Sequence, residues 1–348
     1  MHLFSTEQVS KWHPDKVADQ ISDSILDYCL RHDSNSRVAV ETLVKNSEVY
    51  LAGEITCKED IPYEEIVRTV MEGLSYPVKS VIADITKQSS EICNAVDSDE
   101  KIGAGDQGMM FGYATRETES RLPYGFDIAN KVIEIITEDI ENNKKSIFKG
   151  DAKTQVTVDL DNPGSIPEVI LVSVCHKEGL TIEEVRSYTQ NLLEKNGIKA
   201  KKYILNPSGL WTIGGPVSDS GLTGRKIVCD QYGGYCAVGG GAFSGKDPTK
   251  VDRSGAYMAR ELAVKILNHF EDVNIAEVEL AYGIGIAEPI SVSILTDKKN
   301  AREEIYKYVS TFDLTPSGII KYLDLKNINY ASLAGGCHYR RRLKVFHL

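Results

Sequence analysis

Apolar residues recur at three- and four-residue spacing in three well-separated stretches of the chain, 14–31, 127–142 and 251–269. This spacing places the apolar side chains along one face of an α-helix. We therefore expect three amphipathic helices, each with one face against a hydrophobic core.

Two strand-like runs follow each of these stretches. They cover 38–45 and 48–55, then 155–160 and 168–175, and finally 278–284 and 290–296. An acidic pair then opens a second amphipathic stretch, at Glu64-Glu65, Glu183-Glu184 and Glu303-Glu304, at intervals of 119 and 120 residues. Paired glutamates are common in a first helical turn, but three coincident patterns at nearly equal spacing favour duplication over chance. The pattern predicts an α+β fold with three structurally similar α/β domains.

The first helix has a distinctive start, His13-Pro14-Asp15-Lys16. Proline is favoured at the first helical position, which makes His13 the expected N-cap. Since a helix N-terminus attracts anions, this end is a candidate anion site. Taken alone, the pattern favours a simpler interpretation, in which His13 caps the helix and Asp15 interacts with its dipole.

The first pair of strands predicts a hairpin with a two-residue loop at Asn46-Ser47, which sets its register. Glu41 then faces Ala52, and Glu54 lies diagonal to Glu41 on the same face, about 7 to 8 Å away. Two carboxylates at this distance could each hold a cation or an ammonium group. A solvent-facing strand surface explains the pattern equally well.

The densest cluster of candidate chemistry is the run 239–253, which reads GGGAFSGKDPTKVDR. Three successive glycines allow backbone N–H groups to approach an anion, and Lys246 and Lys250 add positive charge. Asp247 and Asp252 are candidate partners for a metal ion. A turn with solvated lysines is the common alternative for a glycine-rich run.

The same run nearly matches a P-loop. Gly240, Gly245 and Lys246 have Walker A spacing, but Asp247 and Pro248 stand where a Ser or Thr would bind magnesium. A P-loop kinase or ATPase would also need a buried parallel strand before the loop and a helix directly after it. The antiparallel-looking hairpins oppose this function, which is kept as an alternative.

Loops are expected at two glycine clusters, 103–112 and 209–245, which are candidate site loops. The segment 84–101 is polar and has no periodicity, which is typical of a functional or a disordered connection. We interpret this segment as a candidate lid. A surface loop without a role is equally compatible with the sequence.

At 348 residues the chain is longer than one hydrophobic core usually serves, so two or three domains are expected. A net charge of -10 argues against a nucleic-acid footprint, but residues 225–260 carry six basic and three acidic side chains, which suggests a small anionic ligand. Seven cysteines without a C-x-x-C pair are typical of reduced thiols, and neither a signal peptide nor a long apolar stretch is evident. We expect a cytoplasmic protein that binds neither membrane nor nucleic acid.

Two segments closely match a known family: residues 103–114, GAGDQGMMFGYA, and the run 239–253. Supporting matches are the His13 motif together with 18–20, and the segments 151–156, 213–216 and 219–226. On these residues, which extend along nearly the whole chain, the sequence resembles the S-adenosylmethionine synthetase (methionine adenosyltransferase) family.

The resemblance implies a reaction in which the sulfur of methionine attacks C5′ of ATP and expels the intact triphosphate, which the same site hydrolyses to pyrophosphate and phosphate. A thioether is a weak nucleophile, so such a site must align sulfur and carbon and stabilise the charge on the leaving oxygen. The resemblance also implies pseudo-threefold symmetry of the domains and a homodimer with shared active sites, commonly paired into a homotetramer.

Three domains are expected along the chain. Residues 1–100 hold the His13 motif and the lid, residues 101–216 form a central domain, and residues 217–348 hold the glycine-rich phosphate loop. We expect segments to exchange between these domains in space.

The resemblance implies roles for individual residues. Those implied in catalysis are His13, Lys153, Arg225 and Lys246. Those implied in ATP binding are His13, Asp151, Lys153, Trp211, which would stack on adenine, Asp219, Arg225, Lys226, Ala242 and Lys246. Those implied in methionine binding are Glu54, Gln88, Asp106, Asp219 and Lys250. The implied metals are a pair of Mg²⁺ ions, with Asp15 and Asp252 as ligands, and K⁺ at Glu41.

The chain also departs from the family pattern. Ser10-Lys11-Trp12 precedes His13 where the family usually has Ser-Glu-Gly, so a charge is reversed and a ring is added near the expected triphosphate site. Leu210 and Val238 replace a basic residue and a histidine, and the lid differs beyond its first residues. These differences suggest altered kinetics or tolerance for methionine analogues.

A catalytically silent, ATP-binding paralogue is an alternative from another functional class. Such a protein would usually lack His13, Asp15 or Lys246, and all three are present. We therefore expect catalysis.

Overall fold

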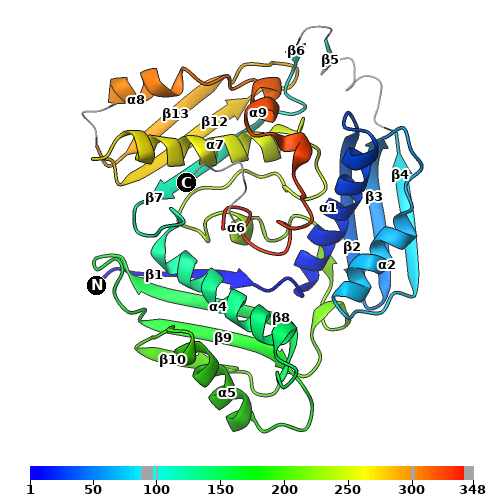
Figure 1. Ribbon diagram of the computed structural model, residues 1–348, viewed down its shortest axis with the longest axis vertical. Coiled ribbons are helices and arrows are strands. Elements are labelled where there is room, and N and C mark those ends of the chain that lie inside the picture. The colour runs from blue at the N-terminus through cyan, green and yellow to red at the C-terminus, as the bar shows by residue number, and fades with distance from the viewer. Residues whose placement is uncertain (88–96, 99–100, 299–301, 341–348) are drawn as a thin grey trace.

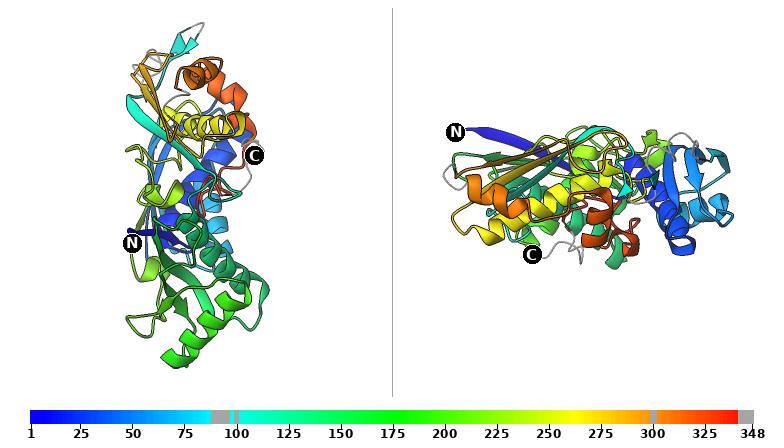
Figure 2. Two further views of the ribbon diagram at one scale, coloured as in Figure 1. Left: turned by 90° about the vertical axis from the view of Figure 1, so that its left-hand side faces the viewer. Right: turned by 90° about the horizontal axis from the view of Figure 1, so that it is seen from above.

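The structure of the protein is a computed structural model that describes residues 1–87, 97–98, 101–298 and 302–340. Within these ranges the chain forms three main β-sheets, each packed against helices (Figure 1). In the side view of Figure 2 the sheets gather toward one side of the molecule and most helices toward the other. The sheets therefore keep one face away from the helices.

The first unit contains the predicted hairpin. Its strands, in spatial order, are β11 (Gly221–Leu222), β2 (Arg37–Lys45), β3 (Glu48–Thr56) and β4 (Ser80–Thr86). Its helices are α1 (Pro14–His32) and α2 (Tyr63–Gly73). The apolar face of α1 packs against β2, where Val17, Ile21 and Val40 are almost fully buried.

The second and third units repeat this plan. The second has strands β1 (Leu3–Val9), β8 (Phe148–Asp159), β9 (Val169–His176) and β10 (Lys202–Leu205), with helices α4 (Tyr124–Asn142) and α5 (Ile182–Lys195). The third has strands β7 (Gly108–Thr115), β12 (Ile275–Tyr282) and β13 (Ser291–Thr296), with helices α7 (Val251–His269) and α8 (Arg302–Val309). The helices α1, α4 and α7 each have 19 residues. This equal length agrees with the repeat predicted from the sequence.

Short elements complete the described part of the chain. They are β5 (Asp97–Ser98), β6 (Lys101–Ile102), α6 (Ile227–Asp230), α9 (Pro316–Tyr322), and the 3₁₀ turns η1 (Gly215–Val217) and η3 (Leu325–Asn327).

Each sheet includes one strand from a distant part of the sequence. Strand β2 pairs antiparallel with β11, β8 with β1, and β12 with β7. The N-terminal strand thus belongs to the second sheet, a central strand to the third and a C-terminal strand to the first. This cyclic exchange ties the three units together through backbone hydrogen bonds.

Several strands were not predicted from the sequence. The glycine cluster 103–112 was expected to form a loop, but β7 begins at Gly108. A Cβ on Gly112 would lie 1.9 Å from the carbonyl oxygen of Ala259, so this glycine permits close packing of α7 on the strand. Strand β8 begins at Phe148 instead of 155, because polar residues and a register irregularity near Gly150 hid its first half.

The candidate lid lies mostly outside the described residues. Strand β4 covers its first residues up to Thr86, and 88–96 and 99–100 are not described. Its role stays a prediction.

The polar face of α1 is buried, and it carries four aspartates at four-residue spacing: Asp15, Asp19, Asp23 and Asp27. We call these residues the aspartate row. Each accepts at least one backbone N–H from the C-terminal third of the chain. The donors are, in order, Leu222, Gly224, Gly245, and the pair Tyr330 and Ala331, at 2.8 to 3.0 Å. One helix therefore fixes three distant segments, at 222–224, 245 and 330–331.

Two buried ion pairs reinforce this arrangement. The guanidinium of Arg253 binds Asp23 through two hydrogen bonds of 2.8 and 2.7 Å, and neither side chain is exposed. The ammonium of Lys16 binds Asp19 at 2.9 Å and Asp230 at 2.5 Å. Both pairs connect α1 to the C-terminal third.

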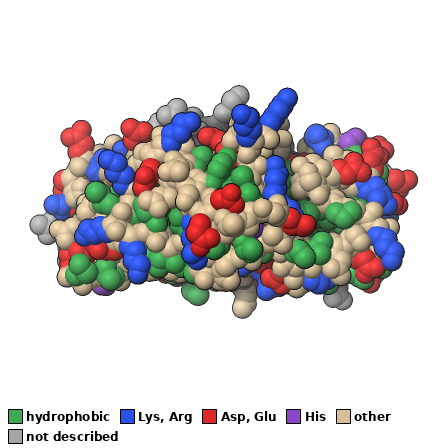
Figure 3. All heavy atoms as spheres, turned by 90° about the horizontal axis from the view of Figure 1, so that it is seen from below, with side chains coloured by type: hydrophobic (Ala, Val, Ile, Leu, Met, Phe, Trp, Pro, Cys, Tyr) green, Lys and Arg blue, Asp and Glu red, His purple; other side chains and the backbone are tan. Residues whose placement is uncertain are grey.

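Acidic and basic side chains are interspersed over the face of the molecule that Figure 3 shows. A search of the described ranges for a helix long and apolar enough to cross a bilayer finds none.

Glu261 on α7 yields a prediction about stability and pH. Its side chain is fully buried, and the nearest ammonium, that of Lys265, lies 3.7 Å from one oxygen. Burial, which outweighs the charges of Lys265 and Arg260, raises the pKa of Glu261 from 4.5 to about 7. Tyr308 and Tyr322 also face the Glu261 carboxyl group. Because the folded state holds this proton more tightly than the unfolded state, stability decreases as the pH rises from 4.5 to about 7, by at most about 3 kcal/mol.

The difference in Tm between the variant Glu261→Gln and wild type should therefore shift in favour of the variant when the pH is raised from about 5 to about 8.5. Thermal unfolding at both pH values measures this gain. The exposed Glu304→Gln is the control and should show no such trend. An identical difference in Tm at both pH values would contradict the assignment.

Candidate active site

The N-terminus of α1 places His13 in a defined orientation. His13 is the N-cap, Pro14 is the first helical residue, and His13 Nδ1 accepts the backbone N–H of Asp15 at 3.2 Å. The predicted capping role is confirmed. Since Nδ1 accepts this hydrogen bond, the proton of a neutral imidazole is assigned to Nε2, which can donate to a ligand.

His13 is held in its neutral form. Burial and the positive charges of Lys226 and Lys153 lower the pKa of His13 from 6.5 to about 3, against the opposite effect of Asp15 and Asp219. These five side chains come from α1, β8 and the segment 219–226. The fold thus brings five of the predicted site residues into one group.

Asp15 connects α1 to the segment after β11. Its carboxylate accepts a hydrogen bond of 2.6 Å from Lys226 Nζ and one of 3.0 Å from the backbone N–H of Leu222, and Arg225 Nε lies 3.7 Å away. Burial by itself would raise the pKa of Asp15, but the bonds from Lys226 and Leu222 outweigh burial and lower it. Asp15 is therefore a carboxylate surrounded by cations.

Asp151 on β8 adds a buried acceptor to this group. Its Oδ2 accepts the backbone N–H of Gly215 at 2.7 Å, while Oδ1 is buried and has no hydrogen-bond partner in the described part of the chain. Burial raises the pKa of Asp151 to about 6, with smaller effects from Lys153, Asp219 and Lys226. A buried oxygen without a partner is unfavourable, so a ligand donor would complete its bonding.

Trp211 lies beside this group and is half-buried. Its backbone N–H donates to His176 Nε2 at 3.0 Å, and its indole N–H donates to the carbonyl of Ile213 at 2.7 Å. The polar edge of the indole is thus bonded within the protein, and a planar surface remains for stacking.

The glycine run forms a loop along β2 and lacks the geometry of a P-loop. The backbone N–H of Val40 donates to the carbonyl of Gly245, and that of Asp247 donates to the carbonyl of Val38, both at 3.0 Å. Residues 231–250, all described, contain no strand, and α7 begins only at Val251. This geometry opposes the P-loop alternative.

This contact closes a pocket of about 300 Å³ between the hairpin and the loop. The residues that line it include Glu41, Glu54, Ala242, Ser244 and Lys246. The predicted hairpin register is confirmed, with Glu41 opposite Ala52 and Glu54 opposite Ala39. The two glutamates predicted to share a face therefore lie in one pocket with two predicted ATP-binding residues.

The first turn of α7 completes the second group of site residues. Lys246 Nζ binds Asp252 Oδ2 at 2.6 Å. A Cβ on Gly105 would lie 3.6 Å from the side chain of Lys250, which places Lys250 beside the segment that carries Asp106. Asp106 itself is exposed.

The two groups meet at two small residues. A Cβ on Gly224, which precedes Arg225, would lie 2.5 Å from the Cβ of Ala242 in the glycine loop. The first group, around His13, and the second group, around Lys246, are therefore adjacent at this point.

Asp247 is not available to a metal ion, contrary to its interpretation as a candidate partner. It is fully buried, and its carboxylate accepts hydrogen bonds from the backbone N–H of Val38, at 2.7 Å, and from the N–H and hydroxyl of Thr249, at 2.9 and 2.6 Å. Asp247 therefore fixes the loop to β2. The residue that breaks the P-loop pattern has a structural role.

Lys11 and Trp12, which were expected to alter the triphosphate site, point elsewhere. Lys11 forms an ion pair with Glu141 on α4, and the ring of Trp12 is 6% exposed. A Cβ on Gly150 would lie 2.6 Å from the ring of Trp12, so the ring supports the strand that carries Asp151. Trp12 is therefore a core residue.

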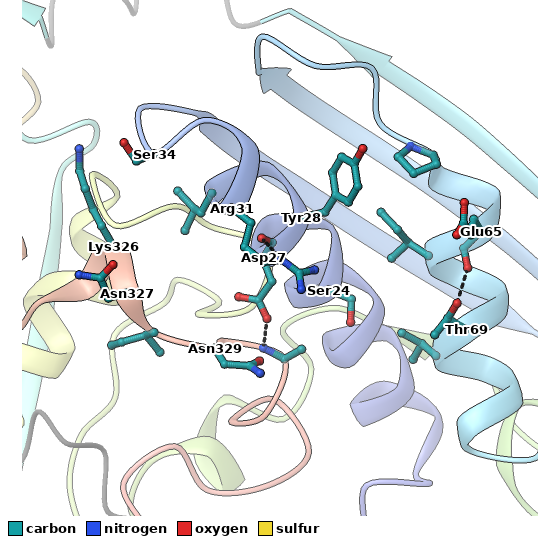
Figure 4. Close-up of a pocket in the computed structure, with 16 residues that line it drawn as sticks. Ser24, Asp27, Tyr28, Arg31, Ser34, Glu65, Thr69, Lys326, Asn327 and Asn329 are labelled. Atoms are coloured by element: carbon teal, nitrogen blue, oxygen red, sulfur yellow. Dashed lines mark hydrogen bonds between the residues drawn. The ribbon is translucent and has the colours of Figure 1, made fainter.

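Gln88 lies outside the described residues, so its predicted methionine contact stays untested. The cavity in Figure 4, about 730 Å³ between α1, α2 and residues 326–331, contains none of the predicted site residues. Its wall includes Asp27, which binds the backbone of the C-terminal segment.

Sequence reasoning missed the residues that hold the glycine loop in place. Asp23 accepts the backbone N–H of Gly245 at 2.8 Å, and Arg253 donates to the carbonyl of Lys246 at 3.1 Å. The signal was present, since the four aspartates of α1 recur at the spacing of one helical face.

Comparisons with known proteins identify the family of the chain. Three family models match consecutive parts of the chain. They describe the N-terminal domain of S-adenosylmethionine synthetase, which matches residues 1–100, its central domain, which matches 101–211, and its C-terminal domain, which matches 213–347. The S-adenosylmethionine synthase of Mycoplasmopsis synoviae (strain 53) is 42% identical over 357 residues, which cover 97% of this chain and 92% of the relative. The chain belongs to the S-adenosylmethionine synthetase family.

Proposed function

We propose that the two groups of site residues form the active site in which this synthetase makes S-adenosylmethionine from ATP and L-methionine. The observation that carries this proposal is the convergence of His13, Asp15, Lys153, Asp219 and Lys226 at one helix N-terminus. These residues come from three distant parts of the chain. No contact among the described residues favours a kinase or a silent paralogue.

The triphosphate of ATP is assigned to the cations of the two groups. Lys153 and Arg225 are exposed, and Lys226 and Lys246 are partly buried against carboxylates. Triphosphate is strongly anionic, and cations fixed at a helix N-terminus bind it without reorganisation. The same cations would stabilise the negative charge that develops when triphosphate leaves C5′.

His13 is assigned to the leaving oxygen. A neutral imidazole with its proton on Nε2 is a hydrogen-bond donor that needs no protonation from solvent. The methionine sulfur supplies an electron pair to C5′ while the C5′–O bond breaks and its electron pair remains on triphosphate. A hydrogen bond from His13 to that oxygen is strongest in the transition state.

The adenosine part of ATP is assigned to Trp211, Asp151 and Ala242. The half-buried indole offers a stacking face, and the free Oδ1 of Asp151 is an acceptor for an amino or hydroxyl group of adenosine. Ala242, which lines the pocket beside Lys246, leaves room because its side chain is small.

Methionine is assigned to charged residues that come from both groups. Its ammonium is matched by the carboxylates of Glu54, Asp106 and Asp219, and its carboxylate is matched by Lys250. Gln88, which is not described, is proposed as a further contact.

Carboxylates in the site fit divalent metal ions. Asp15 and Asp252 offer hard oxygen donors that now bind lysines, and no group of three or more His, Cys, Asp or Glu residues forms a protein cage within the described ranges. This is the arrangement expected for Mg²⁺, which takes one or two carboxylates together with substrate phosphates and water. We propose a pair of Mg²⁺ ions at Asp15 and Asp252, which would neutralise triphosphate charge, and K⁺ at Glu41.

A homodimer with shared active sites, assembled into a homotetramer, is proposed as the working form. Support comes from exposed apolar side chains that lie side by side on β2, β3 and β4: Leu43, Tyr50 and Ile82. Exposed apolar residues of this kind mark association surfaces when they are contiguous. The division into domains 1–100, 101–216 and 217–348 and a cytoplasmic location are also part of the proposal.

The direct test is turnover. Purified protein with ATP, methionine, Mg²⁺ and K⁺ should form S-adenosylmethionine, pyrophosphate and phosphate, and mass spectrometry with a phosphate assay detects all three. Folded protein that forms no S-adenosylmethionine under these conditions would refute the proposal.

Replacement of the loop lysine tests where triphosphate binds. Lys246→Ala should lower kcat about 100-fold or more because one cation no longer balances triphosphate charge, and Tm should change little. Steady-state kinetics and thermal unfolding measure both. The matched control is Lys145→Ala, at an exposed turn after α4, which should keep the wild-type rate. A rate near wild type in Lys246→Ala would show that triphosphate binds elsewhere.

The pH dependence of the rate tests the state of His13. With a pKa of about 3, His13 stays neutral over the working range, so kcat/KM should show no ionisation of His13 near pH 6.5. His13→Ser, which keeps a helix-capping side chain, should lower kcat about 100-fold without removing any ionisation from the profile. The assignment would be wrong if the wild type had a titration near pH 6.5 that disappears in this variant.

A further inference from the structure

One buried ion pair holds the backbone on both sides of Lys246. Asp23 Oδ1 accepts the N–H of Gly245 at 2.8 Å, and Arg253 Nη1 donates to the carbonyl of Lys246 at 3.1 Å. The two residues also bind each other through both carboxylate oxygens, and neither is exposed to solvent. The peptide that carries Lys246 is therefore tied at each end to the same pair.

The orientation of Arg253 is itself fixed. Its Nε donates to Tyr257 at 3.2 Å, and its guanidinium lies 4.1 Å from the ring centre of Tyr330. With Asp23 and the Lys246 carbonyl bound to the remaining nitrogens, the planar group has partners on every edge. The fixed guanidinium of Arg253 therefore also fixes the position of the Lys246 carbonyl that it binds.

The loop passes close to β2 at this point, where only a glycine fits. Gly245 has a φ of +81°, and a Cβ there would lie 2.0 Å from the carbonyl oxygen of Val40. Asp247 binds the adjacent strand on the other side of Lys246. Arg253 also follows Asp252 directly in the first turn of α7. The Asp23–Arg253 pair therefore fixes the position of Asp252, whose carboxylate binds Lys246.

We propose that Asp23 and Arg253 are positioning residues that aim the ammonium of Lys246 at the triphosphate. This inference rests on the proposed function, which assigns Lys246 to the phosphates. Neither side chain reaches the pocket itself, so both act through the loop backbone. A shift of this backbone by about 1 Å would be enough to lower the rate about 100-fold.

The test combines kinetics with binding of inorganic tripolyphosphate. Asp23→Asn keeps an oxygen for Gly245 but removes the charge that orients Arg253. We expect a loss in kcat and in tripolyphosphate affinity of about 10- to 100-fold, with the KM for methionine within about twofold of wild type. Asp139→Asn is the matched control, since Asp139 is a buried carboxylate that binds Ser146 and Tyr188 far from the loop, and it should keep wild-type values.

A double variant separates positioning from general destabilisation. If Asp23 acts through Lys246, adding Asp23→Asn to Lys246→Ala should cause no further loss of tripolyphosphate affinity. Arg253→Lys is the second variant, which retains a charge for Asp23 but cannot bind Asp23 and the Lys246 carbonyl together. It should show the same defect, and it decides the question if Asp23→Asn does not fold.

Wild-type kcat and tripolyphosphate affinity in a folded Asp23→Asn or Arg253→Lys variant would overturn the inference. Independent, multiplicative losses in the double variant would also overturn it. Failure of the proposed function has a different signature, since the wild type would then form no S-adenosylmethionine, while the tripolyphosphate comparison would still decide whether Asp23 positions Lys246.

Discussion

The structure depends on the burial of the polar face of α1. Four aspartates on this face cannot be left without partners in the interior, because an unpaired buried charge is strongly unfavourable. Backbone N–H groups at Leu222, Gly224, Gly245 and the pair 330–331 satisfy them. One helix of the first unit thereby determines where the C-terminal third of the chain must lie.

The candidate active site is a consequence of this constraint. Leu222 and Gly224 lead directly to Arg225 and Lys226, so their backbone bonds to α1 bring these two cations to its N-terminus. Gly245, bound to Asp23 further along α1, leads to Lys246, which lies by Asp252 in the first turn of α7. The exchanged strand β1 adds β8, with Asp151 and Lys153, to the same place. Burial, together with the positive charges of Lys226 and Lys153, lowers the pKa of His13 to about 3. The groups that would meet triphosphate are therefore ordered before a ligand arrives, which is the condition for electrostatic catalysis.

The sequence was most informative where a local rule acts alone. The three long helices, most of the paired strands after them and the Glu41–Ala52 register follow from periodicity and turn length. Predictions failed where a distant segment decides the outcome. Gly112 is a strand residue because α7 packs on it. Asp247 holds the glycine loop against β2 because the backbone N–H of Val38 lies opposite its carboxylate. Trp12 is a core residue because Gly150 leaves room for its ring.

By itself the sequence determined the repeated α/β units, the helix cap at His13 and, through two signature segments, the family and its reaction. Those properties depend on neighbouring residues or on ordered motifs, so they can be recognised along the chain. Only the tertiary structure decided which strand joins which sheet and that Asp247 holds the glycine loop to β2. It also decided which buried pair holds Lys246. These outcomes depend on partners up to 304 residues away, because burial obliges each polar group to find one wherever the fold supplies it.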